Sequence, residues 1–302
     1  MPQRSSTLDL GLWLALAVMW SSSYAVIKVG VETVAPMVLV AGRMTIGAVA
    51  ILAVLWTLGR RLSWSRRAWI DYAVTGLLGS TFPFLLITYG EMSVDSALAA
   101  ILMGCAPVAT IVLANAILPE EPMTERVLIG AGCALAGVAL LVGPEALYGL
   151  GADVLAQLAI VGATLCYAAS TIYIKVAVRR PALEMAAGSM TFGAVFVTIA
   201  ALVAGQSFAV PTTPTAAGAI IYLGLVSTAS ANLIYFHLVP RLGATKMSQV
   251  NFAVPVGGTL IGAILLGESL DLQRGIALAV ILGAVYLVLS SKRVAERQAR
   301  AV

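Results

Sequence analysis

The chain has 302 residues, of which 60% are hydrophobic and only 11% are charged, and its mean hydropathy is +0.98. A soluble domain carries roughly 25% charged residues, so this composition excludes a soluble globular protein and indicates an integral membrane protein. The formal net charge of +4 therefore concerns membrane orientation and gives no support to nucleic-acid binding.

Apolar runs of about twenty residues, the length that a helix needs to cross a bilayer, follow one another along the whole chain. Charged residues and Pro/Gly clusters separate these runs. The expected fold class is an all-α integral membrane protein with ten transmembrane helices. The expected spans are approximately 9–28, 36–57, 69–90, 95–117, 124–142, 153–175, 184–204, 216–238, 244–266 and 272–290.

Lysine and arginine residues sort to one side of this arrangement when the N-terminus is placed inside. That side receives, among others, Arg60, Arg61, Arg66, Arg67 and the basic tail at 291–302, whereas the other side receives only Lys28 and Arg274. Cytoplasmic loops carry the excess of positive charge, so both termini of this multi-pass protein are expected in the cytoplasm. No cleavage pattern of small residues follows the first apolar run, which is therefore interpreted as a span and not as a signal peptide.

One segment of the chain occurs twice in similar form. MGCAPVATIVLANAILPEE begins at Met103, and NFAVPVGGTLIGAILLGES begins at Asn251. The prolines Pro107 and Pro255 are 148 residues apart, and so are the glutamates Glu120 and Glu268. Gly76 and Gly224, and Arg126 and Arg274, keep the same separation. A shared separation indicates that one element has been duplicated.

The duplication divides the chain into a first five-helix repeat at 9–142 and a second at 153–290, followed by the basic cytoplasmic tail at 291–302. Because five is an odd number, the second repeat should enter the membrane from the opposite side. Inverted repeats of this kind place a substrate site near the bilayer midplane, between the two halves, and expose it to each face in turn. The pattern therefore favours a transporter that works by alternating access.

Prolines inside the fourth and ninth spans indicate where that site lies. Proline has no N–H to donate to the carbonyl four residues earlier, so Pro107 and Pro255 should free the carbonyls of Met103 and Asn251. In lipid such groups must be satisfied by neighbours or line a cavity. We therefore expect helix breaks at Pro107 and Pro255 and a midplane cavity beside them, lined by spans 1, 3, 4, 6, 8 and 9.

Several motifs together resemble the EamA group of the drug/metabolite transporter superfamily. They are the two five-span halves, WSSSYAVIK in the first span, an early arginine in the second span (APMVLVAGRMTIGAVAIL), and a fourth span that ends in APVATIVLANAILPEE. The resemblance covers residues 9–290 and implies ten helices, cytoplasmic termini and export of small metabolites, commonly amino acids, from a bacterial inner membrane. Within the group the chain is similar to the YddG-like exporters of aromatic and other neutral amino acids. Ala106 stands where that subgroup is expected to have an aromatic residue, which argues against an aromatic-only substrate range.

The candidate substrate-binding residues are aromatic or polar side chains on the expected cavity-lining spans and one buried cation. They are Trp20, Ser23, Arg43, Phe82, Tyr89, Met103, Tyr167, Ser170, Asn232, Tyr235, Gln249 and Asn251. Tyr167 and Ser170 are the repeat counterparts of the Trp20 region. For the aromatic and amide residues the alternative role is helix packing. For Arg43 the alternative to a substrate carboxylate is a structural anchor to Glu32, Glu91 or helix-end carbonyls.

Other functions fit the sequence less well. No acidic residue lies near the middle of an expected span, which favours facilitated export over the rival, a multidrug, polyamine or other metabolite exporter coupled to protons. Any proton coupling would use His237 or a carboxylate at a span end. An intramembrane enzyme would need a catalytic constellation that the chain lacks. The three cysteines suit core packing, and no spacing indicates a metal or a cofactor. The expected partners are a small-molecule substrate and the lipid bilayer, in a monomer or a homodimer.

Overall fold

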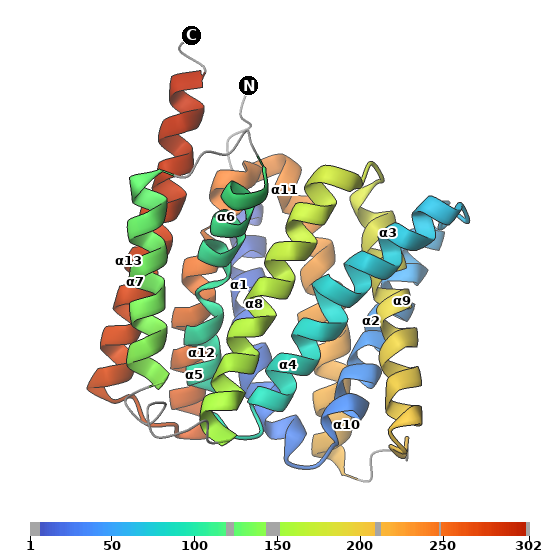
Figure 1. Ribbon diagram of the computed structural model, residues 1–302. Helices are drawn as coiled ribbons and strands as arrows, with labels where there is room; N and C mark the ends of the chain where they lie inside the picture. Colours follow the sequence, from blue (N-terminus) through green and yellow to red (C-terminus); the bar gives the residue numbers. More distant parts are fainter. Residues whose placement is uncertain (1–6, 119–123, 143–151, 209–212, 248, 300–302) are drawn as a thin grey trace.

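The computed structural model describes residues 7–118, 124–142, 152–208, 213–247 and 249–299. Every regular element in these ranges is a helix, and Figure 1 shows the helices side by side in one bundle, most of them running between its two ends. The all-helical fold class predicted from composition is confirmed. Glu120 lies outside the described residues.

The first half of the chain forms a helical unit whose segments agree with the expected spans to within a few residues. Its helices are α1 (Thr7–Val31), α2 (Pro36–Thr57), α3 (Arg66–Gly76), α4 (Phe82–Gly90), α5 (Ser96–Met103), α6 (Ala106–Ile117) and α7 (Glu125–Val142). A π-helical segment, η1 (Leu77–Thr81), joins α3 to α4.

The second half follows the same order of elements. Its helices are α8 (Ala152–Ala177), α9 (Ala182–Val203), α10 (Pro214–Ile221), α11 (Ala231–Met247), α12 (Val250–Leu266) and α13 (Leu272–Ala299). The π-helical segment η3 (Tyr222–Ser230) joins α10 to α11. Helix α13 continues to Ala299, so the backbone of residues 291–299 is helical where the sequence suggested only a basic tail.

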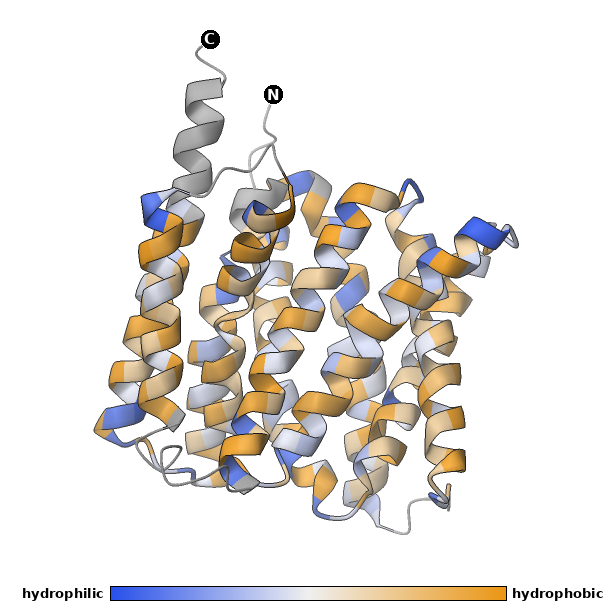
Figure 2. Ribbon diagram, in the orientation of Figure 1, coloured by the Kyte–Doolittle hydropathy of each residue, from blue (hydrophilic) through white to orange (hydrophobic). Residues whose placement is uncertain are grey.

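Seven helical stretches in the described part of the chain are long and apolar enough to cross a membrane: Thr7–Val31, Pro36–Thr57, Arg66–Gly90, Ser96–Ile117, Asp153–Ala177, Ala182–Val203 and Pro214–Val239. Two shorter apolar helices lie at Val250–Leu266 and Leu272–Val288. Figure 2 shows that the middle of the bundle is mostly hydrophobic and that the most hydrophilic residues gather near its two ends. A protein that spans a lipid bilayer needs this distribution, because the hydrocarbon core contains no water to bind polar groups.

Packing between the halves follows the 148-residue separation. Helix α1 packs against α12, and its counterpart α8 packs against α6, the counterpart of α12. Helices α2 and α9, and likewise α7 and α13, are counterparts that pack against each other. In Figure 1, α1 runs from the end that holds both termini towards the other end, whereas α8 runs in the opposite direction.

Ion pairs join the two halves at both ends of the bundle. At the end near the start of α3, Arg180 of the second half pairs with Asp71 at 3.4 Å, and Tyr72 donates a 2.5 Å hydrogen bond to Glu184. At the opposite end, Arg274 pairs with Asp95 at 2.7 Å. These contacts hold the two halves together near both ends of the bundle.

Glycines allow the third segment of each half to lie directly on the second helix of the other half. A Cβ added at Gly76 would come within 2.5 Å of the Ser189 carbonyl oxygen of α9. A Cβ added at Gly224 would come within 3.1 Å of the Arg43 carbonyl oxygen of α2. Only glycine fits such backbone-to-backbone contacts, so the repeated glycines fix how closely the halves approach each other.

The variant Gly76→Ala should destabilise the protein, because the added methyl group meets backbone that cannot rotate away. Overpacking of this kind costs about 1–3 kcal/mol, so the thermal unfolding temperature in detergent should fall. Gly132→Ala in α7 is the control, because a Cβ there meets nothing within 4 Å and alanine favours a helix. An unfolding temperature for Gly76→Ala equal to that of Gly132→Ala would contradict this account of the contact.

Candidate functional site

The two π-helical segments lie at equivalent places in the two halves. Segment η1 follows Gly76, and η3 contains Gly224, its counterpart in the repeat. A π turn carries i→i+5 hydrogen bonds and is rare, and such turns are frequent at functional sites. Because both segments lie where the halves touch, the boundary between the halves is the place to look for a site.

Arg43 is a cation buried at this boundary. Its side chain extends from α2, the residue is only 6% exposed, and its Nε donates a 2.8 Å hydrogen bond to Thr228 Oγ1 in η3. The guanidinium carbon lies 3.8 Å from the ring centroid of Phe84 in α4, which is a cation–π contact. Arg43 is therefore held by one group from each half.

The anchors suggested for Arg43 from the sequence were not its hydrogen-bond partners. Thr228 accepts its hydrogen bond and Phe84 makes the cation–π contact, while Glu91 interacts with Arg43 only through longer-range electrostatics, as do Tyr24 and Tyr167. The sequence could not identify Thr228, because it is 185 residues away. We call Tyr24, Arg43, Tyr167 and Thr228 the arginine cluster; it draws on α1, α2, α8 and η3.

An aromatic group lies one helical turn from this cluster. Trp20 of α1 contacts Tyr235 of α11, with ring centroids 5.8 Å apart, and Tyr235 contacts Phe236 at the same distance. Trp20 and Tyr24 are four residues apart in α1, so they share a face of that helix. The first span thus carries an aromatic surface one turn from Tyr24, and a substrate-binding role for Trp20 stays a prediction.

The polar candidates close to these aromatic residues donate hydrogen bonds to backbone carbonyls three or four residues earlier in the chain. Ser23 is buried, and its Oγ donates to the Trp20 carbonyl at 2.6 Å. Asn232 Nδ2 donates to the Thr228 carbonyl at 2.7 Å. Ser22, which was not among the candidates, instead reaches across to the Tyr222 hydroxyl of η3 at 2.7 Å. Ser22 and Tyr222 therefore join α1 to η3 beside the arginine cluster.

The fourth segment is interrupted before Pro107. Helix α5 ends at Met103, and α6 begins at Ala106 with Pro107 in its first turn. Between them, Gly104 N–H donates to the Ile101 carbonyl at 3.0 Å, and Cys105 N–H donates to that of Leu102 at 3.1 Å. Gly104 N–H also keeps a regular helical bond to the Ala100 carbonyl at 3.2 Å, so the helix tightens locally just before Pro107.

The ninth segment behaves differently. Helix α12 runs from Val250 to Leu266 with Pro255 inside it, so the break expected at Pro255 is not found. A proline in the second turn of a helix removes one hydrogen bond near its start, and the turns that follow can hold the helix. Pro255 still lies against the break in the fourth segment, because a Cβ added at Gly104 would come within 3.1 Å of its Cγ.

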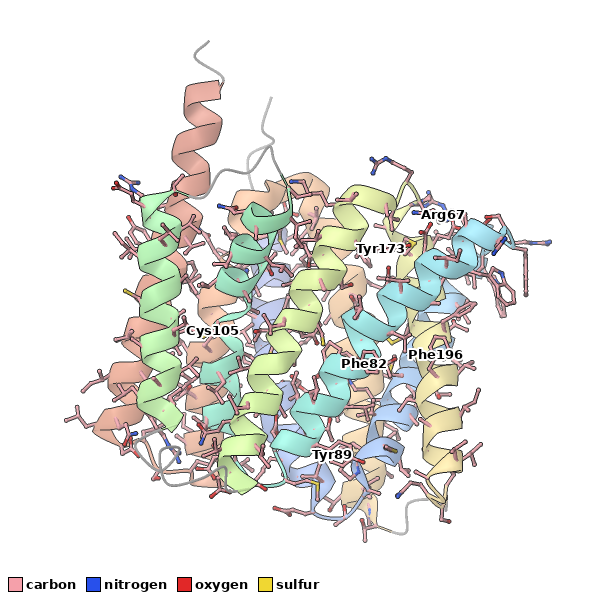
Figure 3. All side chains as sticks on the ribbon, in the orientation of Figure 1. Arg67, Phe82, Tyr89, Cys105, Tyr173 and Phe196 are labelled. Atoms are coloured by element: carbon pink, nitrogen blue, oxygen red, sulfur yellow. The ribbon has the colours of Figure 1, made fainter. Side chains whose placement is uncertain are left out.

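The remaining candidates are distributed unevenly. Tyr167 is half-buried and belongs to the arginine cluster, Met103 packs against the main apolar core, and Ser170 is buried against Gly79 of η1. Asn251 is half-buried near the start of α12, and Gln249 before it is exposed. Phe82 and Tyr89, labelled on α4 in Figure 3, are 44% and 42% exposed. The structure therefore does not bring Phe82, Tyr89 or Gln249 into the buried cluster, and their role stays a prediction.

Two repeated halves in one apolar helical bundle, with a buried cation held between them, define a membrane protein of duplicated architecture. The chain belongs to the EamA-like transporter family, whose model matches residues 9–143 and 154–290. It is therefore a membrane-spanning transporter with two EamA repeats, as the motifs in the sequence indicated.

Similar proteins cover nearly the whole chain. The uncharacterized transporter YoaV of Bacillus subtilis is 24% identical, over 91% of this chain and 92% of that protein. A probable terminal-alkyne amino-acid exporter of Streptantibioticus cattleyicolor is 30% identical, over 86% and 87% respectively. The uncharacterized inner membrane transporter YedA of Escherichia coli is 28% identical, over 93% and 90%. A crystal structure with 21% sequence identity matches 96% of this chain and 99% of the other with a TM-score of 0.66, which supports the fold.

The variant Thr228→Val should lower stability, because valine has a similar shape but no oxygen to accept the bond from Arg43. Polar contacts between membrane helices contribute about 0.6–1.7 kcal/mol, so we expect a modest fall in unfolding temperature. Thr191→Val is the control, because the Thr191 hydroxyl donates to the Ala187 carbonyl of its own helix. In an Arg43→Met background, Thr228→Val should cause no further loss. An undiminished loss there would show that the two residues are not coupled.

Proposed function

We propose that the protein exports neutral amino acids, aromatic ones included, and related small metabolites across a bacterial inner membrane by alternating access. The observation that carries this proposal is the buried Arg43. Among the described residues its hydrogen bond runs through Nε to Thr228, which leaves both Nη groups to bind a carboxylate. Arginine binds carboxylates with two parallel hydrogen bonds, so a substrate with a carboxylate suits this position.

The aromatic group supports a substrate of amino-acid size. Trp20 lies one turn along α1 from Tyr24 and contacts Tyr235 of α11, and residues one turn apart have Cβ atoms about 5–6 Å from each other. A substrate carboxylate at Arg43 would therefore place its side chain against the rings of Trp20 and Tyr235. The name of the exporter from Streptantibioticus cattleyicolor agrees with this substrate class.

The proposal includes a topology of ten membrane-crossing segments in two inverted repeats. Seven stretches and two shorter helices are already apolar enough by composition, and α7 completes the set as counterpart of α13. Arg67, labelled in Figure 3, lies at the end of the bundle at which α13 finishes. We assign that end to the cytoplasm, because basic residues favour the inside, and the name of YedA agrees with an inner membrane.

A proton-coupled exporter of cationic drugs, polyamines or other metabolites remains the second candidate. Cationic substrates need a buried carboxylate, and the sequence offered none near the middle of a span. The structure contains a fully buried carboxylate at Glu91, so this candidate has a specific observation in its favour. The substrate that the protein transports distinguishes this candidate from the amino-acid exporter.

Purified protein in liposomes loaded with unlabelled phenylalanine, leucine, methionine or threonine should take up the same amino acid in labelled form by counterflow. Trp20→Ala should raise the KM for phenylalanine by about tenfold, the loss of roughly 1.4 kcal/mol of aromatic contact, and should change threonine transport less. Trp64→Ala is the control, because Trp64 is 80% exposed. Counterflow of a polyamine and of none of the amino acids would refute the amino-acid assignment.

A further inference from the structure

Glu91 is a carboxylate that neither the fold nor the proposed substrate contacts explain. It follows the last residue of α4, Gly90, and is 0% exposed. Both of its carboxylate oxygens are buried without a hydrogen-bond partner among the described residues. An ionisable group that is rare inside a membrane protein and has no bonding partner marks a functional site.

The nearest cation does not bond to this carboxylate. Lys28 of α1 donates from Nζ to the main-chain carbonyls of Glu91 at 2.9 Å and of Val94 at 2.8 Å. It therefore supports the connection between α4 and α5, and it interacts with the Glu91 side chain through electrostatics only. Lys28 offsets part of the cost of a buried negative charge but leaves both oxygens open.

Other charged groups face Glu91 from two further elements. Arg43 of α2 attracts its negative charge, and Glu268, which follows α12, repels it. Glu268 itself accepts 2.8 Å bonds from the backbone N–H groups of Ser96 and Ala97 at the start of α5, so it is held as a second negative group nearby. Tyr24 of α1 also interacts with Glu91 electrostatically.

The helices on the remaining sides bring groups that are either uncharged or already paired with another charge. Helix α8 contacts Gly90 through Ala156 and Ile160 and carries Gln157, whose Oε1 is buried without a partner among the described residues. Helix α5 carries Ser96, whose Oγ is also buried and unbonded there, while its neighbour Asp95 is paired with Arg274. Glu91 is thus the one carboxylate near these helices that is fully buried and without a bonded partner among the described residues.

Two occupants could satisfy such a carboxylate. A proton neutralises it and removes the cost of burying a charge. A substrate ammonium satisfies it with charge-assisted hydrogen bonds. Arg43 and Glu91 interact electrostatically, and no ion pair joins them among the described residues. A zwitterion could therefore place its carboxylate at Arg43 and its ammonium at Glu91.

We propose that Glu91 binds a proton and the substrate ammonium in turn, so that the transporter exchanges protons for amino acids. The inference rests on the proposed transport function. When the ammonium enters, the O–H bond of the Glu91 carboxyl breaks, the proton leaves to water, and the carboxylate pairs with the ammonium. When the substrate leaves on the other side, the carboxylate takes a proton from water there. Proton and substrate compete for one group and therefore move in opposite directions.

Glu91→Gln tests this exchange, because glutamine has the same shape and cannot titrate. In wild-type liposomes with an acidic interior, a gradient of one pH unit should raise steady-state amino-acid accumulation by up to about tenfold for one proton exchanged. Glu91→Gln should remove this stimulation while its unfolding temperature and its residual counterflow show a folded protein. Glu32→Gln, which changes an exposed carboxylate at the end of α1, and His237→Gln, which changes an exposed histidine, should both keep it.

Three results would overturn the proton site. They are wild-type amino-acid accumulation that ignores the pH gradient, stimulation that persists in Glu91→Gln, and stimulation that His237→Gln removes. Infrared difference spectra between acidic and alkaline buffer test the site without any substrate. The wild type should show the band of a protonated carboxyl group in an apolar environment, and Glu91→Gln should lack it. If amino-acid counterflow is absent but this band is present, the proposed substrate fails and the proton site stands.

Discussion

The close contact between η3 and α2 determines much of what lies between the two halves. Gly224 has no side chain, so its turn of the π segment lies on the backbone of α2 at Arg43. One turn further on, Thr228 comes within hydrogen-bond distance of the Arg43 side chain. A larger residue at 224 would move Thr228 away, and a buried cation would lose its bonded partner. The hydrogen bond that holds the buried Arg43 therefore depends on the absence of a side chain at Gly224.

The repeat gives this contact a counterpart with different chemistry. Gly76 brings η1 onto α9, where Thr81 donates from Oγ1 to the Gly193 carbonyl at 3.3 Å. The repeat counterpart of Thr228 is Ser80, not Thr81. Each close approach therefore places a hydroxyl at a different position, where one bonds to a carbonyl and the other to an arginine. Duplicated backbone geometry has been kept while the side chains have diverged, so the buried charge is not symmetric within a nearly symmetric bundle.

The sequence predicted what depends on period and repetition. Apolar run length placed the helical segments, and the separation of 148 residues identified their counterparts. It could not predict that the same proline interrupts one segment and not the other. Gly104 precedes Pro107 by three residues, whereas Phe252 holds the equivalent place before Pro255. A Cβ at Gly104 would come within 2.8 Å of the Ile101 carbonyl oxygen and 3.1 Å of Pro255 Cγ, so this tight turn has no room for a side chain. Nor could it predict the environment of Glu91, because a position at a helix end indicates exposure until the packing of α1, α5 and α8 is known.

Helices α5 and α12 come from different halves of the chain, yet they are joined at two levels. Glu268 holds the first turn of α5 at one end, and Gly104 rests on Pro255 further along. A displacement of α12 would therefore carry α5 with it. A rigid body that moves during a transport cycle would then contain one helix from each of the two repeats, so the moving units would differ from the repeats themselves.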